Sequence, residues 1–178
     1  HPIYGYTAND SCFCYHFGNY DYKLYFPFRK QGKFIHINSH IIQGFQQLPE
    51  EGDNLLITKS FKDVMAIDVL SREFDLYSIA PMSETILIPK DIFINIYNRF
   101  DNMATLFDFD RAGIKLMRKY KEAYQLPYYF FGKDFRGRVF GKPELKDYAD
   151  HQRLKGLDET RRLIERFIIK PQITGDVF

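Results

Sequence analysis

The chain has 178 residues, of which 45% are hydrophobic and 17% are aromatic, and its formal net charge is only +2. This size and composition suffice for one domain with an apolar core, or for a small domain plus a lobe. No apolar run is long enough to cross a membrane and the N-terminus lacks the pattern of a signal peptide, so we expect a cytoplasmic protein with no membrane partner. The chain begins within a segment that is expected to be folded, which suggests a piece of a longer protein.

The two cysteines, Cys12 and Cys14, lie too close together in the chain to form a useful disulfide, which agrees with a reducing compartment. Both alternate with His16 onto one face of a predicted strand, and His36 and His40 follow, so a zinc site could be drawn from these residues. The spacing lacks the two separated ligand pairs that are typical of such sites. We therefore expect ordinary half-buried strand residues here.

Residues 1–50 are predicted to form a small antiparallel β-rich lobe. Its strands are expected at residues 11–17, 22–28 and 33–37. The pairs Gly18-Asn19 and Gln31-Gly32 between these strands are typical of turns. A polar break at residues 49–53 marks the predicted boundary of the lobe.

Residues 51–150 alternate between short apolar runs and amphipathic stretches of helical period. Strands are predicted at residues 55–58, 76–80, 103–107 and 128–131. Helices are predicted at residues 61–70, 92–100 and 113–124, the second of them starting beside Pro89. The alternation predicts an α/β domain with a mostly parallel, Rossmann-like sheet flanked by helices. Residues 151–178 are predicted to be a C-terminal helical extension, in which the helix at 157–169 is the clearest.

Two aspartates separated by one residue, Asp108 and Asp110, follow the apolar run at residues 104–107. Side chains alternate faces in an extended segment, so the two carboxylates are expected to point the same way. They repel each other unless a cation neutralises them, and magnesium prefers such hard oxygen ligands. Because ligands bind at the carboxyl ends of strands in parallel sheets, the pair predicts a metal-dependent phosphoryl-transfer site. The alternative is a strand end that leads into a helix N-cap.

Three stretches in this order resemble the motifs of the Toprim domain, which is shared by primases, topoisomerases and some nucleases. They are residues 55–65 (LLITKSFKDVM), 106–113 (LFDFDRAG) and 146–150 (KDYAD). The resemblance covers residues 53–150. The preceding stretches 22–28 (YKLYFPF) and 43–49 (QGFQQLP) are similar to part of the RNA-polymerase lobe that precedes Toprim in phage-type, bacterial DnaG-like DNA primases.

The resemblance implies that Asp108, Asp110 and an aspartate of the third motif hold Mg²⁺ or Mn²⁺. Asp147 matches the third position best, and Asp150 is a weaker match. In the family, such metals grip the triphosphate of the incoming ribonucleotide, which is attacked by a 3′-hydroxyl.

The first motif departs from the family pattern, because Lys59 stands where a glutamate is usual, with Asp63 in register. A lysine cannot bind magnesium, so it would compete with the metal for the aspartates or reach a phosphate directly. In one interpretation Lys59 replaces the charge of a second ion and Glu84 gives the missing carboxylate. In the other, the site is degenerate and only binds. The first interpretation makes Lys59, Asp63 and Glu84 catalytic candidates beside the aspartate pair.

Basic residues cluster locally and suit a polyanion, although any such run can also be a solvated face. The candidates for binding template phosphates or the nucleotide are Lys23, Arg29, Lys30, Lys33, Lys62 and Arg111. A second group falls in the predicted helix at 113–124 and comprises Lys115, Arg118, Lys119 and Lys121. Nearby tyrosines could stack on bases.

These features together predict a primase core that synthesises short RNA primers on single-stranded DNA in a bacterial or phage-infected cell. Its expected partners are the DNA template, ribonucleoside triphosphates and a replicative helicase. Two alternatives stay open. One is a Toprim nuclease, which the absence of a glutamate at position 59 disfavours. The other is a catalytically degenerate module that binds nucleic acid or acts as a replisome scaffold.

Overall fold

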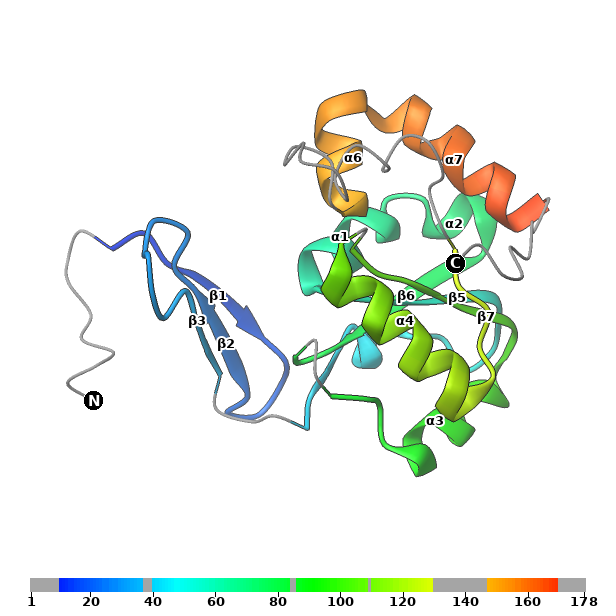
Figure 1. The fold of residues 1–178 in the computed structure, drawn as a ribbon, viewed down its shortest axis with the longest axis horizontal. Coiled ribbons are helices and arrows are strands. Elements are labelled where there is room, and N and C mark those ends of the chain that lie inside the picture. The colour runs from blue at the N-terminus through cyan, green and yellow to red at the C-terminus, as the bar shows by residue number, and fades with distance from the viewer. Residues whose placement is uncertain (1–9, 37–39, 84–85, 109, 130–146, 170–178) are drawn as a thin grey trace. The chain divides into compact units, whose positions relative to one another are not determined.

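The computed structural model describes residues 10–36, 40–83, 86–108, 110–129 and 147–169. The chain divides into two compact units, residues 1–41 and 42–178, and each unit has its own sheet (Figure 1). Among the described residues, no helix is both long and apolar enough to cross a membrane.

The first unit contains a three-stranded antiparallel sheet in the order β1-β2-β3. Its strands are β1 (Phe13–His16), β2 (Tyr22–Tyr25) and β3 (Phe34–His36). The turn between β1 and β2 has positive φ at Gly18 and Asn19, and Gly32 also has positive φ before β3. Glycine adopts positive φ at no steric cost and asparagine tolerates it, which is why both are common in turns. The predicted antiparallel lobe and its turns are therefore confirmed.

The second unit contains a four-stranded sheet in the order β4-β6-β5-β7. Its strands are β4 (Ile42–Gln43), β5 (Gly52–Thr58), β6 (Leu76–Pro81) and β7 (Phe100–Leu106). The central strand β5 is parallel to both β6 and β7, and the short β4 runs antiparallel to β6. The predicted mostly parallel sheet is confirmed, and it gains one antiparallel edge strand.

Helices connect the parallel strands, as the alternating pattern predicts. They are α1 (Phe61–Asp68), α2 (Ser71–Phe74), α3 (Lys90–Tyr97) and α4 (Arg111–Tyr124), followed by α6 (Tyr148–Lys155) and α7 (Leu157–Ile169); a 3₁₀ turn, η2 (Phe45–Gln47), follows β4. Helix α3 begins directly after Pro89, as predicted, but it ends at Tyr97, and Phe100 already belongs to β7.

Both faces of the sheet are covered by apolar cores. In β5, Leu55 and Ile57 contribute to one core, while Leu56 between them contributes to the other. This alternation is the period-two geometry of a strand. Helices α3 and α4 complete the first core, and α1, α6 and α7 complete the second. The result is the flanked sheet that the sequence predicts.

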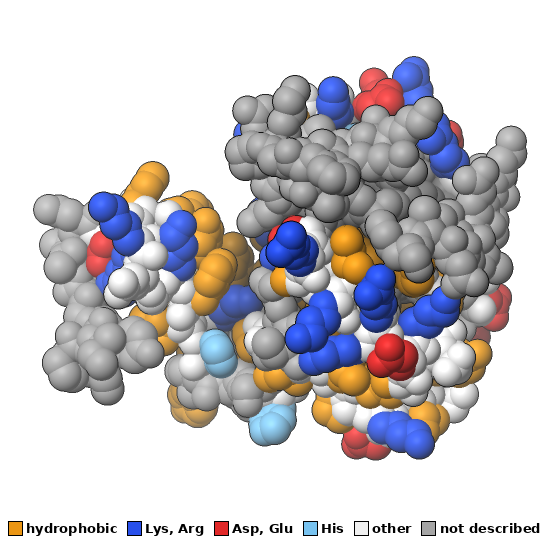
Figure 2. Space-filling model, viewed as in Figure 1, with side chains coloured by type: hydrophobic (Ala, Val, Ile, Leu, Met, Phe, Trp, Pro, Cys, Tyr) orange, Lys and Arg blue, Asp and Glu red, His pale blue; other side chains and the backbone are white. Residues whose placement is uncertain are grey.

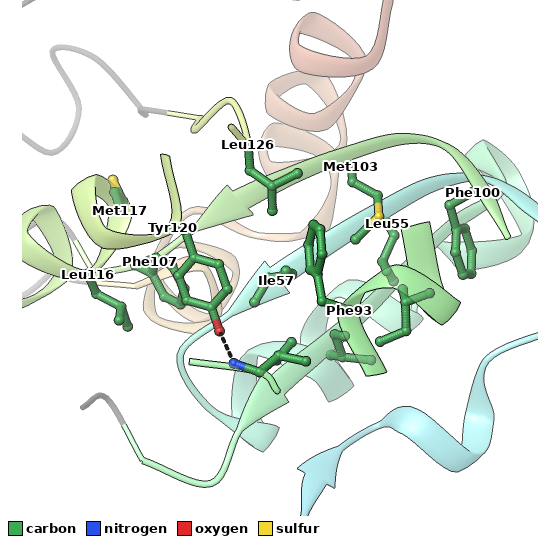
Figure 3. Close-up of a cluster of buried hydrophobic side chains, with 13 residues drawn as sticks. Leu55, Ile57, Phe93, Phe100, Met103, Phe107, Leu116, Met117, Tyr120 and Leu126 are labelled. Carbon is green, nitrogen blue, oxygen red and sulfur yellow. Dashed lines mark hydrogen bonds between the residues drawn. The ribbon is translucent and has the colours of Figure 1, made fainter. Parts of the chain in front are cut away.

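Two tyrosines of α4 form hydrogen bonds to the backbone of the segment before α3. The hydroxyl of Tyr120, which is fully buried, accepts a hydrogen bond from the backbone N–H of Ile88 at 3.2 Å (Figure 3). The Tyr124 hydroxyl donates to the carbonyl oxygen of the same residue. Both backbone groups of Ile88 are thereby satisfied inside the core, as buried backbone groups must be.

The predicted fourth strand at 128–131 is represented by one parallel bridge between Tyr128 and Thr105. The hydrogen bonds Thr105 N–H to Pro127 and Tyr129 N–H to Thr105 flank this bridge. The rest of that predicted strand lies outside the described residues.

Candidate metal centre

The candidate site lies where the parallel strands end. Strands β5 and β7 are paired in register up to Thr58 and Leu106, their last residues. The chain forms β6 on one side of β5 and then crosses to form β7 on the other side. Such a switch point leaves a crevice at the carboxyl ends of the strands, where ligands bind in α/β folds. Lys59 directly follows Thr58, and Asp108 is the second residue after Leu106.

Three buried aspartates meet at this point: Asp63, Asp108 and Asp147. One carboxylate oxygen from each lies within 4.8 Å of the others. Their exposed fractions are only 2%, 1% and 6%. Burying three carboxylates together is costly unless cations or hydrogen bonds compensate them. Within the described part of the chain, this is the one group of three or more acidic, histidine or cysteine side chains at metal-binding distances, and Cys12 and Cys14 are free, exposed thiols.

Asp63 is positioned by the start of α1. Ser60 is the N-cap of this helix, and its hydroxyl accepts from the Asp63 N–H at 3.3 Å and donates to Asp63 Oδ2 at 2.7 Å. The other oxygen, Oδ1, accepts from the backbone N–H of Ala149 at 3.2 Å. The role of Ser60 was not predicted, although Ser-x-x-Asp before an apolar run is a signature of a capped helix start.

Asp147 is the N-cap of α6. Its Oδ1 accepts from the backbone N–H of Asp150 at 2.7 Å, and its Oδ2 lies 2.8 Å from the Lys62 ammonium. The same ammonium lies 3.5 Å from Asp150 Oδ1, so Asp150 stands at the rim of the cluster. Lys62 was predicted to bind nucleic acid, and in the structure it pairs with these two carboxylates.

Asp108 is held by Lys59. The Lys59 ammonium lies 2.5 Å from Asp108 Oδ2, and the lysine side chain is mostly buried, with an exposed fraction of 18%. Asp108 Oδ1 is also buried, and it has no hydrogen-bond partner among the described residues. A buried carboxylate oxygen without a donor is unfavourable. Asp108 Oδ1 is therefore suited to bind a cation.

Gly113 allows α4 to start directly beside Asp108. A Cβ atom at this position would lie 1.8 Å from the carbonyl oxygen of Asp108, which is far inside van der Waals contact. The sequence pattern Asp-x-Asp-x-x-Gly includes this glycine, but its packing role was not predicted.

Burial and like charges raise the pKa values of the carboxyls. Burial and the neighbouring charge of Asp147 raise the pKa of Asp63 to about 7, against the lowering effect of the Ser60 hydrogen bond. Burial raises the pKa of Asp108 to about 6, although the Lys59 ammonium pulls it down. Burial alone would lower the pKa of Lys62, but the hydrogen bond and charge of Asp147 raise it. These crowded carboxyls fit a divalent cation, which prefers hard oxygen ligands and would relieve their repulsion.

Asp110 takes a different position from its partner in the pattern. It is the N-cap of α4, and its Oδ1 accepts from the Gly113 N–H at 2.9 Å. Its charge still contributes to the raised pKa of Asp108, so it lies near the cluster. Glu84, the predicted source of a further carboxylate, lies outside the described residues.

The predicted phosphate-binding residues of the first unit differ in exposure. Lys23 is buried, with its ammonium 5.2 Å from the centre of the Phe34 ring. Arg29 pairs with Asp10 at 2.5 Å and lies over a phenylalanine ring. Lys30 and Lys33 are exposed. Their role in binding stays a prediction.

Helix α4 carries a basic stripe that begins next to the site. Figure 2 shows Lys and Arg side chains gathered on the face where this helix lies. The exposed basic residues at helical spacing are Arg111, Lys115, Arg118 and Lys119. Positions one and two turns apart share a helix face. The stripe therefore extends away from the capped end of α4.

No model of a known protein family matches the chain, and no curated protein matches it. Its fold is shared by solved structures, among them the following three. A chain of the bacteriophage T7 lagging-strand DNA polymerase structure, which contains primase domains of two gp4 subunits bound to an RNA/DNA hybrid and dTTP, matches with a TM-score of 0.55 and 15% identity; the match covers 82% of this chain and 68% of that chain.

The primase fragment of the bacteriophage T7 primase-helicase matches with a TM-score of 0.55 and 17% identity, over 80% of this chain and 55% of that chain. The Aquifex aeolicus primase, comprising zinc-binding and RNA polymerase domains, matches with a TM-score of 0.53 and 18% identity, over 82% of this chain and 36% of that chain. The chain thus has the fold of primase fragments and spans only part of the length of these proteins.

Proposed function

We propose that this protein is the core of a DNA primase, with a Toprim domain that carries out metal-dependent synthesis of short RNA primers. The observation that carries the proposal is the cluster of Asp63, Asp108 and Asp147 at the ends of β5 and β7. The cluster occurs on a fold shared with primase fragments, which supports this assignment over other uses of buried carboxylates.

The proposed reaction is nucleotidyl transfer on a single-stranded DNA template. The 3′-hydroxyl of a primer or first nucleotide attacks the α-phosphorus of an incoming ribonucleoside triphosphate, a new phosphodiester bond forms, and pyrophosphate leaves. A bound Mg²⁺ or Mn²⁺ would neutralise phosphate charge in this step. The three clustered aspartates would hold it, and Asp108 Oδ1 is the oxygen without another partner.

The basic side chains around the cluster suit the phosphates of such substrates. Arg111 is exposed at the first position of α4, where the helix dipole also favours anions. Lys115 and Arg118 continue this stripe along the helix. We assign the stripe to template or nucleotide phosphates and place the reaction in the cytoplasm of a bacterial or phage-infected cell, beside a replicative helicase.

One observation favours a second candidate, a module that binds nucleic acid without catalysis. The ion pair between Lys59 and Asp108 already compensates a carboxylate that the reaction needs for its metal. In that case the fold would be retained for binding alone.

A primer-synthesis assay separates the two candidates. The protein receives single-stranded DNA, labelled ribonucleotides and Mg²⁺ or Mn²⁺, and the products are resolved by length. We expect labelled oligoribonucleotides from the natural protein, and their loss in the Asp108→Asn variant. Asp158→Asn is the matched control, because this aspartate is 88% exposed on α7. Synthesis that survives Asp108→Asn would contradict the proposal, and template binding without synthesis would favour the binding module.

A further inference from the structure

We propose that Lys59 is a fixed cation of the metal centre, which occupies one side of Asp108 and limits the cluster to one divalent ion. The inference rests on the proposed function only in taking the same cluster as a metal site.

The backbone holds the two residues together. Lys59 follows the last residue of β5, and Thr58 is paired with Leu106, the last residue of β7, so both segments leave the sheet side by side. The Lys59 ammonium then lies 2.5 Å from Asp108 Oδ2, with Asp108 only 1% exposed. A charge-assisted hydrogen bond between mostly buried groups is a strong one. The lysine is therefore part of the centre rather than a solvated surface charge.

The six carboxylate oxygens of the cluster are used unequally. Both oxygens of Asp63 accept hydrogen bonds, from the Ser60 hydroxyl and the Ala149 N–H. Both oxygens of Asp147 have donors as well, the Asp150 N–H and the Lys62 ammonium. Of these six oxygens, Asp108 Oδ1 is the one that accepts no hydrogen bond from a described residue.

The free lone pairs on these carboxylate oxygens are sufficient to bind one ion. A carboxylate oxygen has two lone pairs, so an oxygen that accepts one hydrogen bond can still bind a cation. One ion could therefore share Asp108 Oδ1 with one oxygen from each of the other aspartates, which already lie within 4.8 Å of one another. A second ion bridging Asp108 would need Oδ2, where it would lie beside the Lys59 ammonium, and the two positive charges would repel each other.

Titration with Mn²⁺, followed by electron paramagnetic resonance and calorimetry near neutral pH, tests the inference without nucleic acid. We expect one bound ion in the natural protein. Lys59→Met removes the ammonium and is expected to bind Mn²⁺ about tenfold tighter. Lys59→Glu adds a carboxylate at the end of β5 and is expected to raise the number of bound ions from one to two.

Two further variants control for folding and net charge. Lys59→Gln keeps a hydrogen-bond donor for Asp108 without the charge and is expected to tighten Mn²⁺ binding in the same direction, so the test survives if Lys59→Met does not fold. Lys155→Met removes a charge at the far end of α6, about 12 Å from Asp147, and is expected to leave binding unchanged.

Two ions in the natural protein, or unchanged affinity in both Lys59→Met and Lys59→Gln, would overturn the inference. No Mn²⁺ in the natural protein, with binding restored by Lys59→Met, would also overturn it, since the lysine would then exclude the ion. A failure of primer synthesis beside normal binding of one ion would affect only the proposed function.

Discussion

Gly113 packs against the backbone of Asp108 so closely that an added Cβ atom would lie 1.8 Å from the Asp108 carbonyl oxygen. Helix propensity alone makes Gly113→Ala stabilising by about 1 kcal/mol, because the residue lies in the first turn of α4. The contact reverses the sign, since the obstacle is backbone and cannot rotate away. We expect a loss of roughly 2–3 kcal/mol in the free energy of unfolding, measured in urea.

The neighbouring Ala112→Ser is the control for this prediction. Ala112 is exposed in the same turn, so its change should stay within about 0.5 kcal/mol. A Gly113→Ala variant as stable as the natural protein would show that α4 does not start against Asp108.

The hydroxyl of Tyr120 is predicted to stabilise the core. Tyr120→Phe leaves the buried N–H of Ile88 without its acceptor, which should cost about 1–3 kcal/mol in the free energy of unfolding. Tyr97→Phe is the matched control, because Tyr97 is 56% exposed. Equal losses for the two variants in the same urea titration would contradict the role of this hydrogen bond.

The stability of the metal-free protein should depend on pH through Asp63. Its pKa of about 7 in the folded protein exceeds the ordinary value of 3.8, so the folded state binds more protons than the unfolded state between these values. The contribution of this group to stability therefore falls as the pH rises from about 4 to 7. Asp108, with a pKa of about 6, acts in the same direction.

Asp63→Asn removes the larger part of this effect and keeps hydrogen-bonding groups toward Ser60 and Ala149. We expect a shallower decline of melting temperature with rising pH in the presence of a chelator. Asp68→Asn, at the exposed end of the same helix, should behave as the natural protein does. Parallel pH profiles for all three proteins would contradict the assignment.

Asp147 combines two roles that two substitutions can separate. Asparagine is as good an N-cap as aspartate but lacks the charge, so Asp147→Asn should retain stability within about 1 kcal/mol while Mn²⁺ binding weakens about tenfold. Asp147→Ala should lose the metal and roughly 1 kcal/mol more, because the cap hydrogen bond is also lost. Urea unfolding and Mn²⁺ titration measure the two effects, and equal Mn²⁺ affinity in all three proteins would exclude this aspartate as a ligand.

The sheet and its helices were predictable because their signals are local. The apolar runs of β5, β6 and β7 are separated by helical periods, and Pro89 marks the start of α3. The edge strand β4 was not predicted, because two residues carry no periodicity. Its pairing with β6 depends on tertiary contact.

The arrangement of the aspartates could be predicted only in part from local sequence patterns. The alternation argument for Asp108 and Asp110 assumed an extended segment, but β7 ends at Leu106 and Asp110 caps the next helix. The approach of Asp63 to Asp147 depends on α6 docking at the start of α1, where Ala149 donates to Asp63. That docking brings together segments that are remote in the sequence, and no pattern within either segment predicts the contact.

The cluster draws its carboxylates from the first turn of α1, the loop after β7 and the N-cap of α6. An ion shared by all three would act as a cross-link between segments that the unfolded chain keeps far apart. Any species that binds only the folded chain shifts the folding equilibrium by mass action. The concentration of divalent metal would then affect stability as well as catalysis. It would set the free energy with which α6 and α7 pack against the sheet.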